Sequence, residues 1–123
     1  MEEESILTQP LVERRQQMRL TFTEPVQYRN VFKPNELYSG SLARDLSAGG
    51  VRIATPVPLA KDDRLVVLLT LPDAPTVIRA IARVAWQQQK PFGSIYESGL
   101  QFIQITPEDR DLVASFVERG VVS

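Results

Sequence analysis

The most regular stretch of the sequence is Val77-Ile-Arg-Ala-Ile-Ala-Arg-Val-Ala-Trp-Gln87. A period of two places successive side chains on opposite faces of a β-strand, with Arg79 and Arg83 on one of them. The opposite, apolar face is expected to carry Ile78, Ala80, Ala82, Val84 and Trp86. This pattern predicts a long strand with one buried face and one face at least partly in contact with water.

Short apolar stretches separated by polar turns lie on both sides of this strand. The expected strands cover residues 20–28, 37–45, 51–54, 64–71 and 97–105, and the first is interrupted at Glu24-Pro25. A proline inside a strand suits an edge or a bulge. About six short strands spaced this closely favour an antiparallel β-barrel, because closure removes exposed strand edges. The predicted fold is therefore mainly β.

The end of the sequence has the pattern of a helix. Thr106 is expected to be the N-cap, followed by Pro107 at the first helical position, with Asp109 completing a box-like motif. Leu112, Val113, Phe116 and Val117 form one apolar stripe. Gly120 is expected to stop the helix.

The first residues lack any regular period and mix acidic side chains, Gln and Pro10. We expect residues 1–13 to form a mobile arm, residues 14–120 to form one domain, and residues 121–123 to be a short tail. A chain of 123 residues is long enough to bury a core without disulfides or metals.

The composition excludes several classes of function. The sequence has no His and no Cys, which rules out a Ser-His-Asp triad, a thiolate zinc site and a cysteine nucleophile. We therefore expect neither an enzyme nor a metal site. The net charge of −1 argues against non-specific binding to DNA or RNA. No apolar stretch is long enough to insert into a membrane, and the acidic N-terminus lacks signal-peptide features, so a cytoplasmic protein is expected.

The first candidate motif is Arg15-Gln-Gln-Met-Arg19, with Arg14 directly before it. The spacing places both guanidinium groups of the motif on one face, in a helix or an extended segment. Each guanidinium is a planar fork that suits phosphate oxygens and the O6/N7 edge of guanine, and it can stack on a base. Two arginines at this spacing are also common on solvated surfaces.

The second candidate motif is Asp45-Leu-Ser-Ala-Gly-Gly50, between two expected strands. Asp and Ser often cap turns, and glycine often takes positive φ, so the motif can be a turn held by its own side chains. It can also bind a ligand. The carboxylate can accept hydrogen bonds from guanine, the hydroxyl can bond a phosphate or sugar, and Gly49 and Gly50 leave room for close approach.

In this order, the two motifs resemble those of the PilZ domain family, over about residues 14–120. That family has Arg-x-x-x-Arg before its first strand and Asp/Asn-x-Ser-x-x-Gly between its second and third. The segment Gly99-Leu-Gln-Phe102 and the strand that ends at Trp86 also look like the family. The resemblance implies a six-stranded antiparallel PilZ-type β-barrel that binds cyclic di-GMP, a bacterial second messenger.

The resemblance also implies roles for single residues. Arg15 and Arg19 would clasp the phosphates and guanine edges, and Asp45 and Ser47 would bond a guanine and its surroundings. Gly49 and Gly50 would leave the space that the ligand needs. Arg14 precedes the motif, and an arginine there favours a stacked pair of ligands over a single one.

Two further residues are candidates, each with an ordinary alternative. Trp86 could stack on a guanine, or it could be an aromatic residue of the barrel core or rim. Arg52 could contact a phosphate, or it could simply be exposed to solvent.

The implied function is a cyclic di-GMP receptor without a further cofactor. On binding, the N-terminal arm would change conformation and an unidentified partner protein would read the change. The alternative is a PilZ-like protein–protein adaptor that does not bind the nucleotide.

Overall fold

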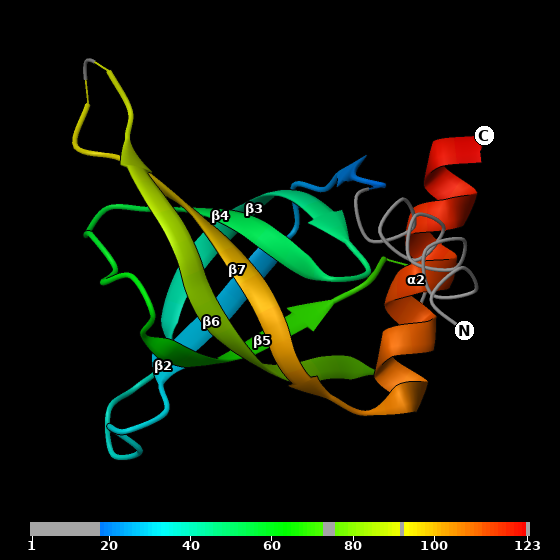
Figure 1. Ribbon diagram of the computed structural model, residues 1–123, viewed down its shortest axis with the longest axis horizontal. Helices are drawn as coiled ribbons and strands as arrows, with labels where there is room; N and C mark the ends of the chain where they lie inside the picture. Colours follow the sequence, from blue (N-terminus) through cyan, green and yellow to red (C-terminus); the bar gives the residue numbers. More distant parts are fainter. Residues whose placement is uncertain (1–17, 73–75, 92, 123) are drawn as a thin grey trace, which may run out of the picture.

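Antiparallel strands and one helix make up the computed structural model, which describes residues 18–72, 76–91 and 93–122 (Figure 1). The expected mobile arm, residues 1–13, lies outside the described residues, and so do the candidate residues Arg14 and Arg15. The elements are β1 (Leu20–Thr21), β2 (Pro25–Asn30), β3 (Ser39–Ser47), β4 (Gly50–Thr55), β5 (Arg64–Thr70), β6 (Val77–Gln89), β7 (Tyr96–Ile105) and α2 (Pro107–Val122).

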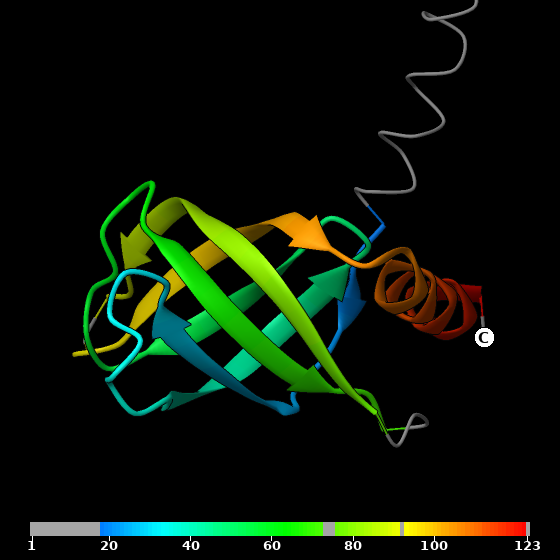
Figure 2. The ribbon, with the colours of Figure 1, turned by 90° about the horizontal axis from the view of Figure 1, so that it is seen from below.

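The sheet closes on itself into a barrel (Figure 2). Its strand order is β1-β3-β2-β5-β6-β7-β4, and β4 pairs back with β3. Both β1 and β2 pair with β3, so they are two parts of one strand interrupted near Glu24-Pro25. Counted in this way, the barrel has six antiparallel strands, which confirms the predicted fold. Closure satisfies the backbone groups that an open sheet would leave exposed.

The core fills the interior of the barrel. Ile78, Ala80, Ala82 and Val84 of β6 are all buried, as their alternation predicts. Ile78, Ala82 and Val84 belong to one core cluster with apolar side chains from every other long strand, among them Val26, Ala43, Leu46, Val51, Ile53, Val67, Leu69 and Leu100. Burying each large aliphatic side chain contributes roughly 1.5–3 kcal/mol, so this core is the main source of stability.

Three register shifts interrupt the strand pairing: one between β3 and β4, and two between β6 and β7, of which the first lies at Ile81–Ala82. In the β3–β4 pairing, the register passes from Ala43 to Asp45, which leaves Arg44 as the extra residue. In the β6–β7 pairing, it passes from Val84 to Trp86. A bulge lets two neighbouring residues point to the same side of the sheet. For this reason Trp86 is 40% exposed, and the prediction that it shares the buried face of Val84 is wrong.

Helix α2 lies at one end of the barrel (Figures 1 and 2). Thr106 is its N-cap, as predicted, because its hydroxyl accepts a hydrogen bond of 3.2 Å from the Asp109 N–H. On the side facing the barrel, the ring of Phe116 meets the ring of Phe22 edge-on at 5.7 Å. Val113 and Val117 are fully buried beside them.

Gly120 does not stop the helix, which continues to Val122. A Cβ at this position would overlap the side chain of Leu20. The glycine therefore allows close packing of α2 on β1, and the predicted role as a helix stop is wrong.

Candidate functional site

The segment from Asp45 to Gly50 forms a tight hairpin rather than the longer turn that its composition predicts. Strand β3 continues to Ser47, which pairs with Gly50 at the start of β4. The Ser47 hydroxyl is buried and donates a hydrogen bond of 3.3 Å to the carbonyl oxygen of Gly50. Since the Asp and Ser side chains of the motif are strand residues, their positions are set by strand pairing.

The glycines of this motif are not needed for positive φ, because no described glycine has one. That part of the prediction is wrong. A Cβ on Gly50 would instead overlap the carbonyl oxygen of Leu100 in β7. The N–H of Phe102 also donates a hydrogen bond of 2.8 Å to the carbonyl oxygen of Gly49. The glycines thus let the hairpin lie directly against β7.

A hollow of about 170 Å³ opens beside this hairpin. It brings together candidate residues from three separate parts of the sequence. Those that line it are Arg19, Ser47, Gly49, Gly50 and Trp86, together with Ala85, Gly99, Leu100 and Gln101. The hollow therefore combines a guanidinium, an aromatic ring and backbone edges.

Trp86 forms one wall of the hollow because Gly99 lies opposite it in the β6–β7 pairing. A Cβ on Gly99 would overlap the indole ring, so the ring lies against the backbone of β7. Part of the ring remains accessible to solvent. An aromatic face that is held in place and partly exposed suits stacking on a flat base.

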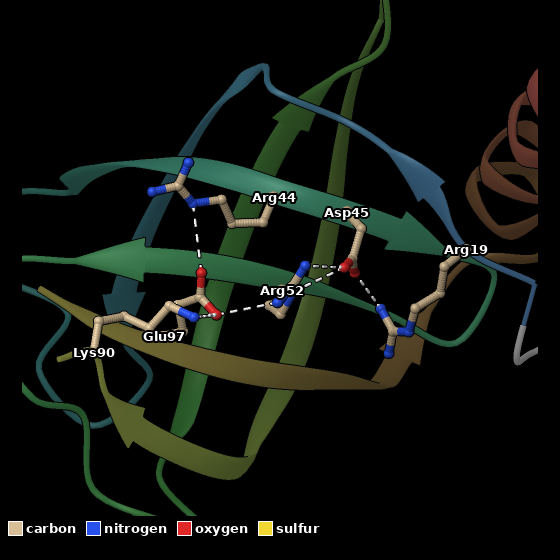
Figure 3. Close-up of polar contacts among 6 residues, drawn as sticks. All are labelled: Arg19, Arg44, Asp45, Arg52, Lys90 and Glu97. Carbon is tan, nitrogen blue, oxygen red and sulfur yellow. Dashed lines mark hydrogen bonds and ion pairs between the residues drawn. The ribbon is translucent and has the colours of Figure 1, made fainter.

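Asp45 lies next to the hollow and holds two arginines (Figure 3). Its Oδ1 accepts from Nη1 of Arg19 at 2.5 Å. Its Oδ2 lies 2.7 Å from both Nε and Nη2 of Arg52, which form a two-pronged contact. Arg52 is thus an ion-pair partner of the motif residue Asp45, rather than a side chain surrounded only by solvent.

Glu97, which is only 6% exposed, extends this cluster (Figure 3). Its Oε1 lies 3.1 Å from Nη1 of Arg52 and 3.5 Å from Nζ of Lys90. Its Oε2 lies 3.6 Å from Nε of Arg44. The bulge in β3 explains why the adjacent residues Arg44 and Asp45 both reach this outer cluster.

Glu97, Gly99 and Gln101 were not among the residues predicted to form the site. Gly99 and Gln101 belong to the segment that resembles the family, so a signal was present, but their contact with the hollow depends on the pairing of β7. Glu97 had no local signal, because its partners come from β3, β4 and the end of β6.

Within residues 18–72, 76–91 and 93–122, no group of three or more His, Cys, Asp or Glu side chains could hold a metal ion. No helix within these ranges is long and apolar enough to cross a membrane.

Several solved structures share this fold. The inhibitor of motility MotI/DgrA of Bacillus subtilis has a TM-score of 0.75 and 18% identity, over 85% of this chain and 50% of that chain. MrkH of K. pneumonia has a TM-score of 0.70 and 18% identity, over 87% and 49%. The chain therefore spans about half the length of either.

A third similar structure is the PilZ domain of YcgR from Escherichia coli with cyclic di-GMP. It has a TM-score of 0.65 and 12% identity, over 85% of this chain and 88% of that chain. A search of curated proteins finds no match. The family model described as PilZ domain matches residues 13–119, nearly the whole sequence. The chain therefore belongs to the PilZ domain family.

Proposed function

We propose that this protein is a receptor for cyclic di-GMP and acts by binding, not by catalysis. The observation that carries the proposal is the meeting of Arg19, Ser47, Gly49, Gly50 and Trp86 around one hollow. These residues come from the stretch before β1, from the β3–β4 hairpin and from β6. A similar barrel, the PilZ domain of YcgR, has been solved with this nucleotide.

The lining of the hollow matches the parts of the ligand. The guanidinium of Arg19 suits a phosphate or the O6/N7 edge of guanine. The exposed part of the Trp86 ring offers a surface for base stacking, which is worth roughly 1–3 kcal/mol per base. Asp45 does not line the hollow, but it is paired with Arg19, which does, and its carboxylate can accept from guanine N–H groups.

The charge of the ion-pair cluster that contains Arg19 also favours an anion. The cluster drawn in Figure 3 contains four cations (Arg19, Arg44, Arg52 and Lys90) and two carboxylates, an excess of two positive charges. The chain as a whole carries a net charge of −1. This local excess opposes the overall charge and would attract a ligand with two phosphates.

Ligand binding requires a change in the contacts of Arg19. Its side chain is 45% exposed, so water can replace part of this contact, and Asp45 keeps its two contacts with Arg52 when Arg19 leaves. Moving Arg19 from Asp45 to a phosphate therefore costs little. Asp45 would keep its Oδ2 contacts with Arg52 and present Oδ1 to the ligand.

The hollow by itself is smaller than the roughly 300–1,000 Å³ of typical ligand sites. We propose that Arg14 and Arg15 complete the site over the ligand, so that the N-terminal segment changes conformation on binding. A separate partner protein would then recognise the new surface.

Isothermal titration of cyclic di-GMP tests the proposal. We expect saturable binding in the micromolar range, which corresponds to about −8 kcal/mol. Arg19→Ala should weaken binding by about tenfold or more, since one bidentate arginine contact is worth roughly 1–3 kcal/mol. Arg64→Ala, on the exposed surface of β5, is the matched control and should bind within about twofold of wild type.

Binding by Arg19→Ala within threefold of wild type would contradict the assignment of the site. If the wild-type protein gives no heat of binding and no shift in melting temperature, the receptor function itself is contradicted, because a ligand that binds the folded state must stabilise it. That outcome would favour the adaptor alternative.

A further inference from the structure

We propose that Glu97 is a positioning residue of the ligand site: it orients Arg52, and Arg52 in turn orients Asp45. The expected effect of Glu97 on ligand affinity rests on the proposed function. Its effect on Arg52 can be measured without any ligand.

The burial of Glu97 indicates that its charge is held by specific partners. A buried carboxylate is costly unless cations or hydrogen-bond donors compensate it. The Glu97 side chain is 8% exposed, and three cationic side chains lie within 4 Å of its carboxylate. Only Arg52 among them is hydrogen-bonded to it, through Nη1 at 3.1 Å. The Nε of Arg44 has no hydrogen-bond partner. The bond to Arg52 is therefore the specific contact of this carboxylate.

The shape of the guanidinium transmits this contact to Asp45. Nε and Nη2 of Arg52 both lie 2.7 Å from Oδ2 of Asp45, while Nη1 faces Glu97. The guanidinium is planar and rigid, so an anchor at Nη1 sets the direction of the other two nitrogens. Asp45 is thereby held through one oxygen and keeps Oδ1 on the side of Arg19.

Strand register explains the arrangement. Arg52 lies opposite Asp45 on one side and opposite Gly99 on the other. Gly99 has no side chain that Arg52 could meet. Glu97 lies two residues before Gly99 on β7 and is the diagonal neighbour of Arg52, within reach of a long side chain. The side chains of Arg52 and Glu97 thus meet across β4 and β7.

Without the Glu97 carboxylate, Arg52 would lose the anchor at Nη1. It could then turn toward solvent, since it is already 36% exposed. Asp45 would lose its two-pronged partner and could take rotamers that no longer suit a guanine edge. Ligand affinity should therefore fall although Glu97 does not line the hollow.

The first experiment compares cyclic di-GMP affinity by isothermal titration. Glu97→Gln should bind about tenfold more weakly than wild type, and Glu97→Asp should recover at least part of the loss. The matched control is Asp62→Asn, which removes the carboxylate of an exposed ion pair with Arg83 and should bind within about twofold of wild type.

A further variant separates positioning from general support of the fold. In an Arg52→Gln background, Glu97→Gln should weaken binding by no more than about twofold, because the route through Arg52 is already gone. Loss of about tenfold in that background, or binding by Glu97→Gln within twofold of wild type, would overturn the proposal.

The second experiment needs no ligand. In the wild-type protein, the Nε–H of Arg52 should exchange slowly with solvent in NMR spectra, because Asp45 accepts from it. Glu97→Gln should speed this exchange about tenfold. Unchanged exchange would overturn the positioning role even if the ligand binds. If wild type does not bind cyclic di-GMP but the exchange changes as expected, the receptor function fails and the orientation of Arg52 by Glu97 stands.

Discussion

The Arg52–Asp45 and Arg83–Asp62 ion pairs have the same shortest N–O distance, 2.7 Å, but very different surroundings. The Asp45 side chain is 13% exposed and sits in a cluster with Arg19 and, through Arg52, with Glu97. The Asp62 side chain is 66% exposed, on a turn beside β6. Arg83 also donates to Gln101, so the Asp62 carboxylate is not its sole partner.

The difference shows that distance alone does not set the energy of an ion pair. An exposed pair contributes about 0–1 kcal/mol, because water and salt compete for both charges. Removing one partner of a buried pair costs about 3–5 kcal/mol, because the other charge remains desolvated. The cluster around Asp45 and Glu97 lies between these limits, since its arginines are a third or more exposed.

The largest expected effect comes from breaking the close contact of β4 and β7 beneath the cluster. Gly50→Ala would push a Cβ into the carbonyl oxygen of Leu100, and two paired backbones cannot easily separate. We expect a loss of about 3 kcal/mol in the free energy of unfolding, measured by urea denaturation. Gly40→Ala is the control, because nothing lies within 4 Å of its added Cβ. Equal stability of the two variants would contradict the steric argument.

The next effect compares the two carboxylates directly. Glu97→Ala should lower the free energy of unfolding by about 2 kcal/mol, since Arg52 loses a partly buried partner. Asp62→Ala should change it by less than about 0.5 kcal/mol, as is usual for exposed sites. Urea denaturation of both variants at the same ionic strength measures the difference. A cost for Asp62→Ala as large as that for Glu97→Ala would refute the role given to burial.

A smaller effect should appear in the dependence on salt. The coupling energy between Arg83 and Asp62, measured by a double-mutant cycle, should be about 0.5 kcal/mol at low salt. It should fall to near zero in 1 M NaCl, where the screening length is about 3 Å. The coupling between Arg52 and Asp45 should keep more than half of its value, because water and ions reach it less. Loss of both couplings in parallel would indicate that the two pairs are equally solvated.

The smallest effect concerns an ionisable group outside both pairs. Burial raises the pKa of Tyr28 above 10.0, and a hydrogen bond with Ser39 partly offsets this. The folded protein therefore favours the neutral phenol. This contribution to stability is fully present below about pH 10 and is lost as the pH rises through the pKa of the folded state. Unfolding experiments between pH 9 and 11 should show a smaller decrease for Tyr28→Phe than for wild type.

The strands and the helix could be predicted from the sequence because their signals are local. The alternation of apolar and polar residues in β6 indicates which side chains face the core, and Thr106 followed by Pro107 marks the start of a helix. The bulge that turns Trp86 outward has no such signal, because it arises from the register between β6 and β7. The packing role of Gly120 could not be predicted for the same reason, since the side chain that it contacts, Leu20, lies at the other end of the sequence.

The spacing of the apolar stretches was enough to predict a small barrel, and the two motifs were visible in the sequence as an arginine pair and an Asp-x-Ser-x-x-Gly segment. Which side chains meet depends on how the strands pair in the folded barrel. The folded structure places Trp86 and Arg19 around one hollow and joins Asp45 to Glu97 through Arg52. The physical reason is that alternation and capping depend on neighbours along the chain, whereas ion pairs and steric contacts depend on register between strands far apart in the sequence.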